Sequence, residues 1–401
     1  MTTIDAPTRS GSGTFPTPVR PDDDRFVALA ADIGAIAREH AADHDRDASF
    51  VTEAYAAMRS AGYLALAVPA ELGGLGATMR QVCYAQAELA RHDGATALAA
   101  AMHLYLTAMQ AYRRRAGAPD AEGILRRVAD EAIVIATSGG SDWLWPTTTA
   151  FTDDDGNLHV SGRKAFCSQS PEATAVATCA VLGEPGDGAE VAHFSVPLAA
   201  DGVRIEETWD TLGMRGTASH DLVLDDVVVP GDKIAGRRPY GEFGVPLMAA
   251  LVHFAPIGGA TYYGIAAGAR DVAVDGATAG ARGPRSLSEL PRVQRQVGLM
   301  DAKLRGAWWG LLGAVDEMGD DYTADPATAA MAMIAKRQAV TEAIEVVDLA
   351  MEVLGGRAYF RRSPLERAYR DVRAGTFHPF TPEATLTYAG RLALGDPGTT
   401  E

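Results

Sequence analysis

The chain has few cysteines and no excess of positive charge. Its 401 residues include three cysteines, and the formal net charge is −16 at pH 7. Cys83, Cys167 and Cys179 show neither the short spacings of a metal site nor the even-numbered framework of a disulfide-rich domain. We therefore expect no metal site and a reduced, cytoplasmic setting. An acidic chain also lacks the basic surface that nucleic-acid binding needs.

Long hydrophobic segments are missing too. The sequence shows no uninterrupted apolar run of membrane-spanning length, and it does not start with the basic and apolar pattern of a secretory signal. Residues 1–24 are rich in Thr, Pro, Ser, Gly and Asp, which predicts a disordered N-terminal tail. Hydrophobic residues make up 47% of the chain, which is enough to build a sizeable core.

Three regions with different patterns follow the tail. Residues 25–130 are predicted to be helical, because apolar residues such as Phe26 and Ile33 recur at the spacing of one helix face. Residues 131–235 contain short β-rich runs separated by Asp-Gly and Gly-Glu-Pro-Gly turns, which predict a barrel or sandwich. Residues 236–401 return to long apolar-faced segments, typical of a four-helix bundle. The expected fold class is multidomain α+β.

Three motifs occur in the order and at the separations of one known family. The helical region carries "MRSAGYLALAVPAELGGLGAT". The β region ends in "TWDTLGMRGTASHDLVLDDVVVP", and the bundle carries "AMEVLGGRAYFRRSPLERAYRDVRA". Each motif resembles a block of the acyl-CoA dehydrogenase superfamily of flavoproteins. The resemblance covers nearly the whole chain beyond the tail. It implies a helical domain, a β-barrel domain, a four-helix bundle and a bound flavin.

The resemblance also implies residues that hold the flavin ring. In "IATSGGSDW", Thr137, Gly140 and Ser141 match the loop that hydrogen-bonds the flavin pyrimidine edge and pyrophosphate in the family, although the loop is shorter here. In "GRKAFCSQS", Phe166 and Ser168 match the aromatic that stacks on the isoalloxazine ring and the hydroxyl that bonds its N5 atom. Without the resemblance, the better explanation of this segment is an ordinary strand with small side chains.

Other segments match the part of the family that holds the rest of the cofactor. Gly355 and Gly356 are similar to glycines that approach the adenosine half of FAD in a neighbouring subunit, with a helix C-cap as the alternative. The pyrophosphate arginine of the family falls near Arg282 or Arg285, which also fit solvated surface positions. The resemblance thus implies FAD, or FMN in a two-component monooxygenase, and a homodimer or homotetramer.

The carboxylate that removes the substrate α-proton in acyl-CoA dehydrogenases is missing. The family places this base in a "Tyr-Glu-Gly-Thr" stretch, which corresponds here to "HPFT" at residues 378–381. Pro379 therefore replaces the base, while Thr381 still matches a residue that contacts the flavin. Some relatives carry the base on a bundle helix, at a position that corresponds to Phe254. Neither position is acidic in this chain.

Flavin monooxygenases of the same fold need no such base. They take reduced flavin from a partner reductase, form a C4a-peroxide with oxygen, and transfer an oxygen atom to an aromatic, amine or sulfur substrate. "RDVRAGTFH" and "FCS" resemble this subgroup, so His378 is a candidate to protonate or hydrogen-bond the peroxide, or to deprotonate the substrate. His103 lies on an apolar helix predicted to reach the pocket. It is a second candidate, with a buried core histidine as the alternative.

Three functions stay open at this point. The first is a flavin-dependent monooxygenase or oxidase for a small organic substrate, with His378, Ser168 and His103 as catalytic residues. The second is an acyl-CoA or acyl-carrier α,β-dehydrogenase with a relocated base, such as Glu383 or His378, and an electron-transfer partner. The third is a non-catalytic flavin-binding protein. No local motif identifies the substrate, and neither a nucleic-acid nor a membrane partner is expected.

Overall fold

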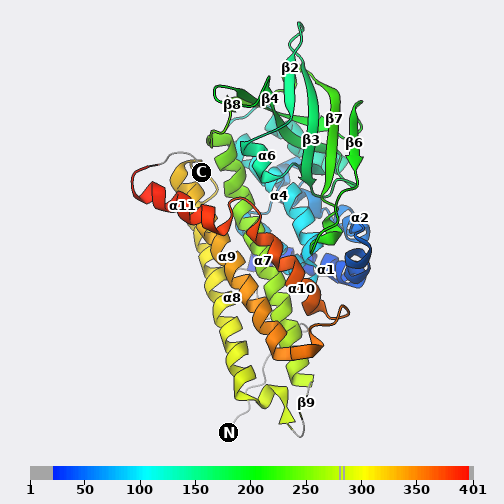
Figure 1. Cartoon of the computed structure of the whole chain (residues 1–401), viewed down its shortest axis with the longest axis vertical. Helices are drawn as coiled ribbons and strands as arrows, with labels where there is room; N and C mark the ends of the chain where they lie inside the picture. The colour runs from blue at the N-terminus through cyan, green and yellow to red at the C-terminus, as the bar shows by residue number, and fades with distance from the viewer. Residues whose placement is uncertain (1–20, 280, 283–284, 397–401) are drawn as a thin grey trace.

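A β-sheet domain lies between two helical regions along the chain. A computed structural model describes residues 21–279, 281–282 and 285–396. In Figure 1 the sheet occupies one end of an elongated molecule, and long helices extend away from it. The predicted order of helical domain, β domain and helical bundle is confirmed.

Five helices form the described N-terminal region. They are α1 (Pro21–Asp47), α2 (Thr52–Ser60), α3 (Met79–His92), α4 (Gly94–Arg115) and α5 (Ala121–Glu131), with 3-10 turns η1 (Tyr63–Ala65) and η2 (Ala70–Leu72). Because α1 begins at Pro21, the last four positions of the predicted tail, residues 21–24, form its first turn. The aspartates of this turn suit the positive end of the helix dipole. Residues 1–20 of the predicted tail lie outside the described residues.

The middle region is one sheet of eight strands among the described residues. Its elements are β1 (Ile135–Thr137), α6 (Gly140–Leu144), β2 (Thr149–Thr152), β3 (Leu158–Cys167), β4 (Ala175–Leu182), β5 (Glu190–Pro197), β6 (Val203–Glu206), η3 (Arg215–Thr217), β7 (His220–Val229), η4 (Gly231–Lys233) and β8 (Gly236–Pro239). The strand order is β6-β7-β3-β2-β4-β5-β8, and β1 pairs in parallel with β4. Strand β8 lies beyond the predicted domain boundary at residue 235. The sheet has its own core of mainly aliphatic side chains, such as Val160, Val176 and Val196.

Three long helices and two short ones form the C-terminal bundle. They are α7 (Val245–Ala279), α8 (Pro291–Met318), α9 (Pro326–Leu354), α10 (Pro364–Val372) and α11 (Pro382–Ala393), with the hairpin β9 (Ala281–Arg282) and β10 (Arg285–Ser286) and turns η5 (Leu287–Glu289), η6 (Gly355–Arg357) and η7 (Arg373–Thr376). Proline occupies the first turn of α8, α9, α10 and α11, where its missing N–H costs no helical hydrogen bond. The predicted four-helix bundle therefore consists of three long helices, α7, α8 and α9, and two short helices, α10 and α11, in place of a fourth long one.

Helix α7 is the central helix of the molecule. Its length and composition would allow it to cross a membrane, but 78% of its most apolar stretch is buried inside the protein, as in the core helix of a soluble fold. It packs closely on α3, because a Cβ at Gly264 would lie 2.2 Å from the carbonyl oxygen of Ala87. On another side it packs against α9. These contacts fix the helix that carries Phe254 and Tyr262.

Candidate active site

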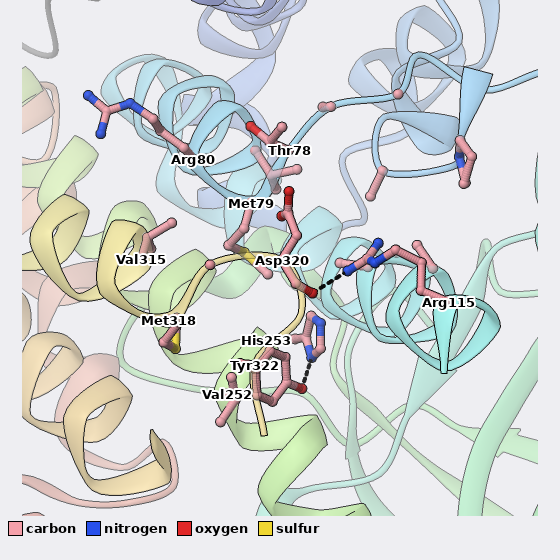
Figure 2. A pocket seen from close by; sticks show the side chains of 18 of the residues that line it. Thr78, Met79, Arg80, Arg115, Val252, His253, Val315, Met318, Asp320 and Tyr322 are labelled. Carbon is pink, nitrogen blue, oxygen red and sulfur yellow. Dashed lines mark hydrogen bonds between the residues drawn. The ribbon is translucent and has the colours of Figure 1, made fainter. Parts of the chain in front are cut away.

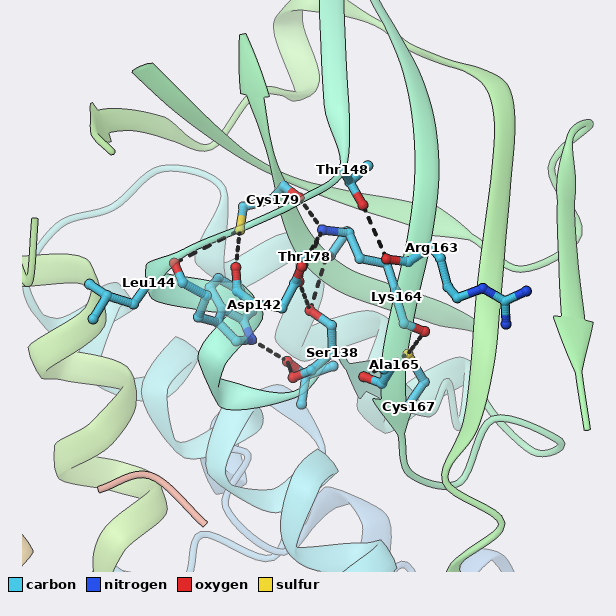
Figure 3. A network of polar contacts seen from close by, with 12 residues as sticks. Ser138, Asp142, Leu144, Thr148, Arg163, Lys164, Ala165, Cys167, Thr178 and Cys179 are labelled. Atoms are coloured by element: carbon cyan, nitrogen blue, oxygen red, sulfur yellow. Dashed lines mark hydrogen bonds and ion pairs between the residues drawn. The ribbon is translucent and has the colours of Figure 1, made fainter. Parts of the chain in front are cut away.

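The loop between β1 and α6 (residues 137–141) is held by a buried ion pair. Lys164 on β3 is fully buried, and its Nζ lies 2.9 Å from Oδ2 of Asp142. The same Nζ donates to the carbonyl oxygen of Cys179, and the Ser138 hydroxyl donates to Asp142 (Figure 3). A buried ammonium without partners is very costly, so this network ties α6 and its preceding loop to the sheet.

This loop meets the turn that replaces the family base. A Cβ at Gly140 would lie 2.0 Å from Cγ of Pro379, so only glycine allows the two segments to approach. Ser141 is exposed at the start of α6. The hydroxyl of Thr137 accepts a hydrogen bond of 2.8 Å from Nε1 of Trp143. The structure therefore places the predicted flavin loop directly against the "HPFT" turn.

Phe166 presents its ring to solvent beside this loop. The pairing of β3 with β7 shifts register between Lys164 and Cys167, and Phe166 has a φ of 59° within that irregularity. Such a bulge redirects a side chain, and Phe166 is 59% exposed. A Cβ at Gly139 would lie 3.1 Å from the ring. An exposed, fixed aromatic next to glycine can cover one face of a flat ligand ring.

Ser168 ends a chain of three hydroxyl groups. Its Oγ lies 2.7 Å from Oγ of Ser219, which lies 2.7 Å from Oγ1 of Thr217. Thr217 donates to the carbonyl oxygen of Met214 at 2.9 Å. Because each hydroxyl has one proton, Ser219 then donates to Thr217, and Ser168 donates to Ser219. Ser168 therefore presents lone pairs, so the hydroxyl that the sequence matched to the flavin N5 atom acts as an acceptor here.

His378 is held by a buried lysine. Lys336 on α9 is 2% exposed, and its Nζ donates to the carbonyl oxygens of His378, Pro379 and Phe380 at 2.8, 3.1 and 3.0 Å. Burial lowers the pKa of Lys336 to about 7. Three carbonyl acceptors match the three N–H donors of an ammonium group, so this turn favours the charged form.

Tyr262 sets the orientation of the His378 ring. Its hydroxyl lies 2.8 Å from Nδ1 of His378. Burial raises the pKa of Tyr262 well above its ordinary value, so the phenol keeps its proton. We assign the phenol as the donor to Nδ1, because among the described residues no other hydrogen bond of this buried hydroxyl would satisfy its proton. The ring proton of His378 is then on Nε2. Burial, and then the charge of Lys336, lower the pKa of His378 to about 3. His378 is therefore neutral at neutral pH, with Nε2–H as a hydrogen-bond donor.

Aromatic side chains surround this histidine. The ring centroids of Phe254 and His378 are 5.8 Å apart, and those of Tyr105 and Phe254 are 5.5 Å apart. Tyr105 also interacts with the Thr137 side chain. Among the described residues, no carboxylate hydrogen-bonds to any of these side chains or to Lys336.

The acidic residues nearest in sequence are engaged elsewhere or exposed. Glu383 is exposed in the first turn of α11, so it does not supply a relocated base over the cluster. Asp371 is buried, and burial raises its pKa to about 7. Its carboxylate accepts a 2.5 Å hydrogen bond from the amide of Met214 and thereby ties α10 to the β domain.

His103 has a structural role, so its predicted place in the pocket is corrected. It is fully buried, and both ring nitrogens bind the backbone. Nε2 donates to the carbonyl oxygen of Leu64 at 2.8 Å, and Nδ1 accepts from the amide of Ile135 at 3.1 Å. Burial lowers its pKa to about 4. The side chain joins the N-terminal helices to β1 and has no free nitrogen for chemistry.

The residues predicted to bind the adenosine and pyrophosphate part of FAD are not part of this cluster around His378. Gly355 follows α9, and at about 1.5 Å rise per residue it is about 28 Å along the helix from Lys336. Arg282 and Arg285 pair in the β9–β10 hairpin beyond the far end of α7, and their side chains lie outside the described residues. Within one chain, Gly355 therefore lies far along α9 from the turn that Lys336 holds. Thr381 caps α11 by accepting from the amide of Ala384.

The residues present fit a flavin. Phe166 offers an exposed ring face, the glycine loop offers close backbone approach, and Ser168 offers a hydroxyl group within the same region. Sequence reasoning missed Lys336 and Tyr262. A single lysine inside the apolar stretch "AMAMIAKRQAV" was the available signal for Lys336, whereas Tyr262 gave none, because its partner is distant in sequence.

Comparisons with known proteins agree with this geometry. Models of the N-terminal, middle and C-terminal domains of acyl-CoA dehydrogenases match residues 28–119, 136–227 and 257–383. Two relatives illustrate the range of activities. The Bacillus subtilis protein YdbM, whose name assigns it to the acyl-CoA dehydrogenases, is 33% identical over 88% of this chain and 93% of its own. The amino sugar nitrososynthase DnmZ of Streptomyces peucetius is 32% identical over 88% of this chain and 89% of its own.

Solved structures show the same similarity. KijD3 in complex with FMN and a dTDP-linked amino sugar superposes with a TM-score of 0.85 at 28% identity, covering 98% of both chains. The dibenzothiophene monooxygenase TdsC of Paenibacillus sp. A11-2 superposes with a TM-score of 0.82 at 25% identity, covering 93% of this chain and 99% of its own.

The hydroxyl chain predicts a preference for reduced flavin. Reduced flavin carries a proton on N5 and suits an acceptor, whereas oxidised flavin does not. In Ser219→Ala, Ser168 is free to turn its proton outward, so the ratio of affinities for reduced and oxidised FMN should fall about 2- to 10-fold, as for the loss of one hydrogen bond. Anaerobic and aerobic titrations of the apoprotein with FMN measure this ratio.

Ser170→Ala is the matched control, because Ser170 is a buried serine that donates to the carbonyl oxygen of Ala218 and lies outside the chain of hydroxyls. An unchanged ratio in Ser219→Ala would show that Ser168 does not act as the acceptor.

Proposed function

This chain belongs to the acyl-CoA dehydrogenase family and is a flavin-dependent enzyme of that fold, and we propose that it transfers one oxygen atom from O₂ to a small organic substrate. The observation that carries the proposal is the turn at residues 378–381. A neutral histidine, held by Tyr262 and Lys336, directly precedes Pro379, which occupies the position of the family base. Among the described residues, no carboxylate hydrogen-bonds to His378, Tyr262 or Lys336.

Each residue of the candidate site would have a separate role in this reaction. A bound reduced flavin supplies the two electrons that reduce oxygen. Phe166 covers one face of the ring, and Ser168 accepts a hydrogen bond at its edge. Nε2–H of His378 donates to the reacting oxygen, and Lys336 keeps the backbone under that imidazole in place. The aromatic rings of Phe254 and Tyr105 exclude water, which strengthens these hydrogen bonds.

A neutral histidine is suited to this task. Removing an α-proton beside a thioester needs a base of adequate strength, and an imidazole whose pKa is about 3 is too weak for it. The same group remains a hydrogen-bond donor across the neutral pH range. This contrast favours oxygen transfer over dehydrogenation at this site.

The relatives favour an amine as the substrate group. DnmZ is named an amino sugar nitrososynthase, and the KijD3 structure holds a dTDP-linked amino sugar. We propose that this chain oxidises a nitrogen atom of a comparable small molecule, with FMN or FAD delivered in reduced form by a separate reductase.

We further propose a homodimer or homotetramer in the cytoplasm. Large apolar side chains are exposed on the single chain, among them Trp309 on α8 (66%), Tyr359 (84%) and Phe377 (80%). Burial of such side chains is the usual reason for self-association. Sedimentation equilibrium of the purified protein should give two or four chains, and a monomer at micromolar concentration would contradict this assembly.

Oxygen transfer should be visible as isotope incorporation. With FMN, NADH and an added flavin reductase under ¹⁸O₂, a dTDP-linked 3-amino sugar should yield a product that contains ¹⁸O, as shown by mass spectrometry. The comparison is an acyl-CoA, which should not bleach the oxidised flavin without oxygen. Bleaching by the acyl-CoA, with no labelled product from amines, sulfides or phenols, would assign the chain to the dehydrogenases instead.

His378 and its tyrosine should both affect turnover. His378→Ala removes the donor, and we expect kcat to fall about 10²- to 10³-fold, as for loss of one positioned hydrogen-bond donor to a reacting oxygen. Tyr262→Phe leaves the imidazole in place but frees its tautomer, so the fall in kcat should be smaller. FMN affinity should stay the same in both variants. Steady-state kinetics and FMN titration measure these effects.

The neighbouring tyrosine offers a matched control. Tyr263 is buried, and its hydroxyl has no hydrogen-bond partner among the described residues. Tyr263→Phe should therefore leave kcat unchanged. If Tyr262→Phe also leaves kcat unchanged, Tyr262 is not a positioning residue for His378.

A further inference from the structure

A cavity lies apart from the residues of the candidate active site. It has a volume of about 530 Å³ and is lined by the turn before α3, the C-terminal half of α4, part of α7 and the connection from α8 to α9 (Figure 2). Its lining includes neither the β1–α6 loop nor Phe166, Ser168 or the turn at residues 378–381. A volume of this size suits a small organic molecule.

Two polar groups face this cavity from its floor. His253 is 4% exposed, and its Nδ1 lies 2.8 Å from the carbonyl oxygen of Ala249. A carbonyl only accepts, so Nδ1 carries the ring proton and Nε2 is a bare acceptor. Tyr322 places its hydroxyl 3.2 Å from the same Nδ1 (Figure 2). Because Nδ1 of His253 carries a proton, the Tyr322 oxygen can only accept a hydrogen bond from it. The proton of the Tyr322 phenol therefore remains available to a ligand.

His253 keeps this acceptor character at neutral pH. Burial lowers its pKa to about 4, and no hydrogen bond among the described residues reaches its Nε2. Tyr322 is held in place by stacking on Tyr112, with centroids 4.4 Å apart and ring planes 16° apart. The floor thus offers one fixed acceptor and one fixed donor, side by side.

The walls of the cavity are mostly small and apolar. They are formed by the side chains of Ala67, Ala77, Met79, Ala108, Ala111, Val252, Val315 and Met318. Such walls favour a hydrocarbon or aromatic body through burial of apolar surface.

The rim carries three arginines that already have carboxylate partners. Arg80 pairs with Asp316 at 2.7 Å, Arg114 pairs with Glu71 at 2.9 Å, and Arg115 lies 3.4 Å from Asp321. A phosphate or carboxylate ligand would have to displace a carboxylate from its arginine. The charge balance therefore favours an uncharged ligand and argues against a nucleotide at this position.

We propose that this cavity binds an uncharged aromatic molecule that carries a hydroxyl group. The hydroxyl donates to Nε2 of His253 and accepts from the Tyr322 phenol, while the ring lies against the apolar walls. This site goes beyond the proposed oxygen transfer, and its residues take no part in that reaction. It is linked to the active site through α7, where the adjacent Phe254 contacts Tyr105 and His378, and through α4, which carries both Tyr105 and Ala111 of the lining.

The test uses a matched pair of probes and two variants of the flavin-loaded protein. Equilibrium dialysis measures the binding of 2-naphthol, which has the hydroxyl, and of 2-methoxynaphthalene, which cannot donate. Ala111→Phe places a ring in the cavity, and Tyr322→Phe removes only the hydroxyl and keeps the stacking on Tyr112. We expect 2-naphthol to bind saturably and more tightly than its ether to the wild type.

Ala111→Phe should abolish this binding, and Tyr322→Phe should weaken 2-naphthol binding about 2- to 10-fold, as for one lost hydrogen bond. Circular dichroism and FMN content confirm that each variant is folded. Absence of saturable 2-naphthol binding, equal binding of the two probes, or binding unchanged in either folded variant would overturn the proposal.

Discussion

The structure of the reactive centre depends on one buried ammonium group. Lys336 reaches from α9 to three successive carbonyl oxygens and so holds the turn that ends at α11. A lysine inside an apolar bundle is unfavourable unless every N–H is satisfied, and the backbone of this turn satisfies all three. Pro379 of this turn packs against Gly140, so the same lysine helps to hold the bundle against the loop of the β domain.

Burial acts alike on three histidines, yet their partners give them different roles. Loss of solvent lowers the pKa of His103, His253 and His378, so each is neutral near pH 7. His103 has both nitrogens bound to backbone and serves only the fold. His253 keeps a free acceptor, and His378 keeps a free donor because Tyr262 occupies its Nδ1. All three pKa values are lowered, so the hydrogen-bond partners of the ring nitrogens, not the pKa, decide the role of each histidine.

Most of the architecture could be read from local patterns. Helical spacing, β-rich runs and three ordered motifs predicted the regions correctly, with small boundary changes at α1 and β8. The motifs also pointed to Phe166, Ser168 and His378. Phe166 lies close to Gly139, and the adjacent Gly140 lies against Pro379 beside His378. The motifs could not give the hydrogen-bond polarity of Ser168, which depends on Ser219 and Thr217 on another segment. His103 is the buried core histidine that the sequence left as the alternative, and its backbone partners come from distant elements.

The sequence alone determined that this is a three-region flavoprotein fold without a carboxylate at the position of the family base, because those facts rest on residue identity and order. Only the tertiary structure decided what replaces that carboxylate. Tyr262 and Lys336 meet His378 from two different helices, and the proton positions and burial that make the imidazole a neutral donor arise from that meeting. Side-chain contacts between segments far apart in the chain leave no local signature, and here those contacts set the chemistry.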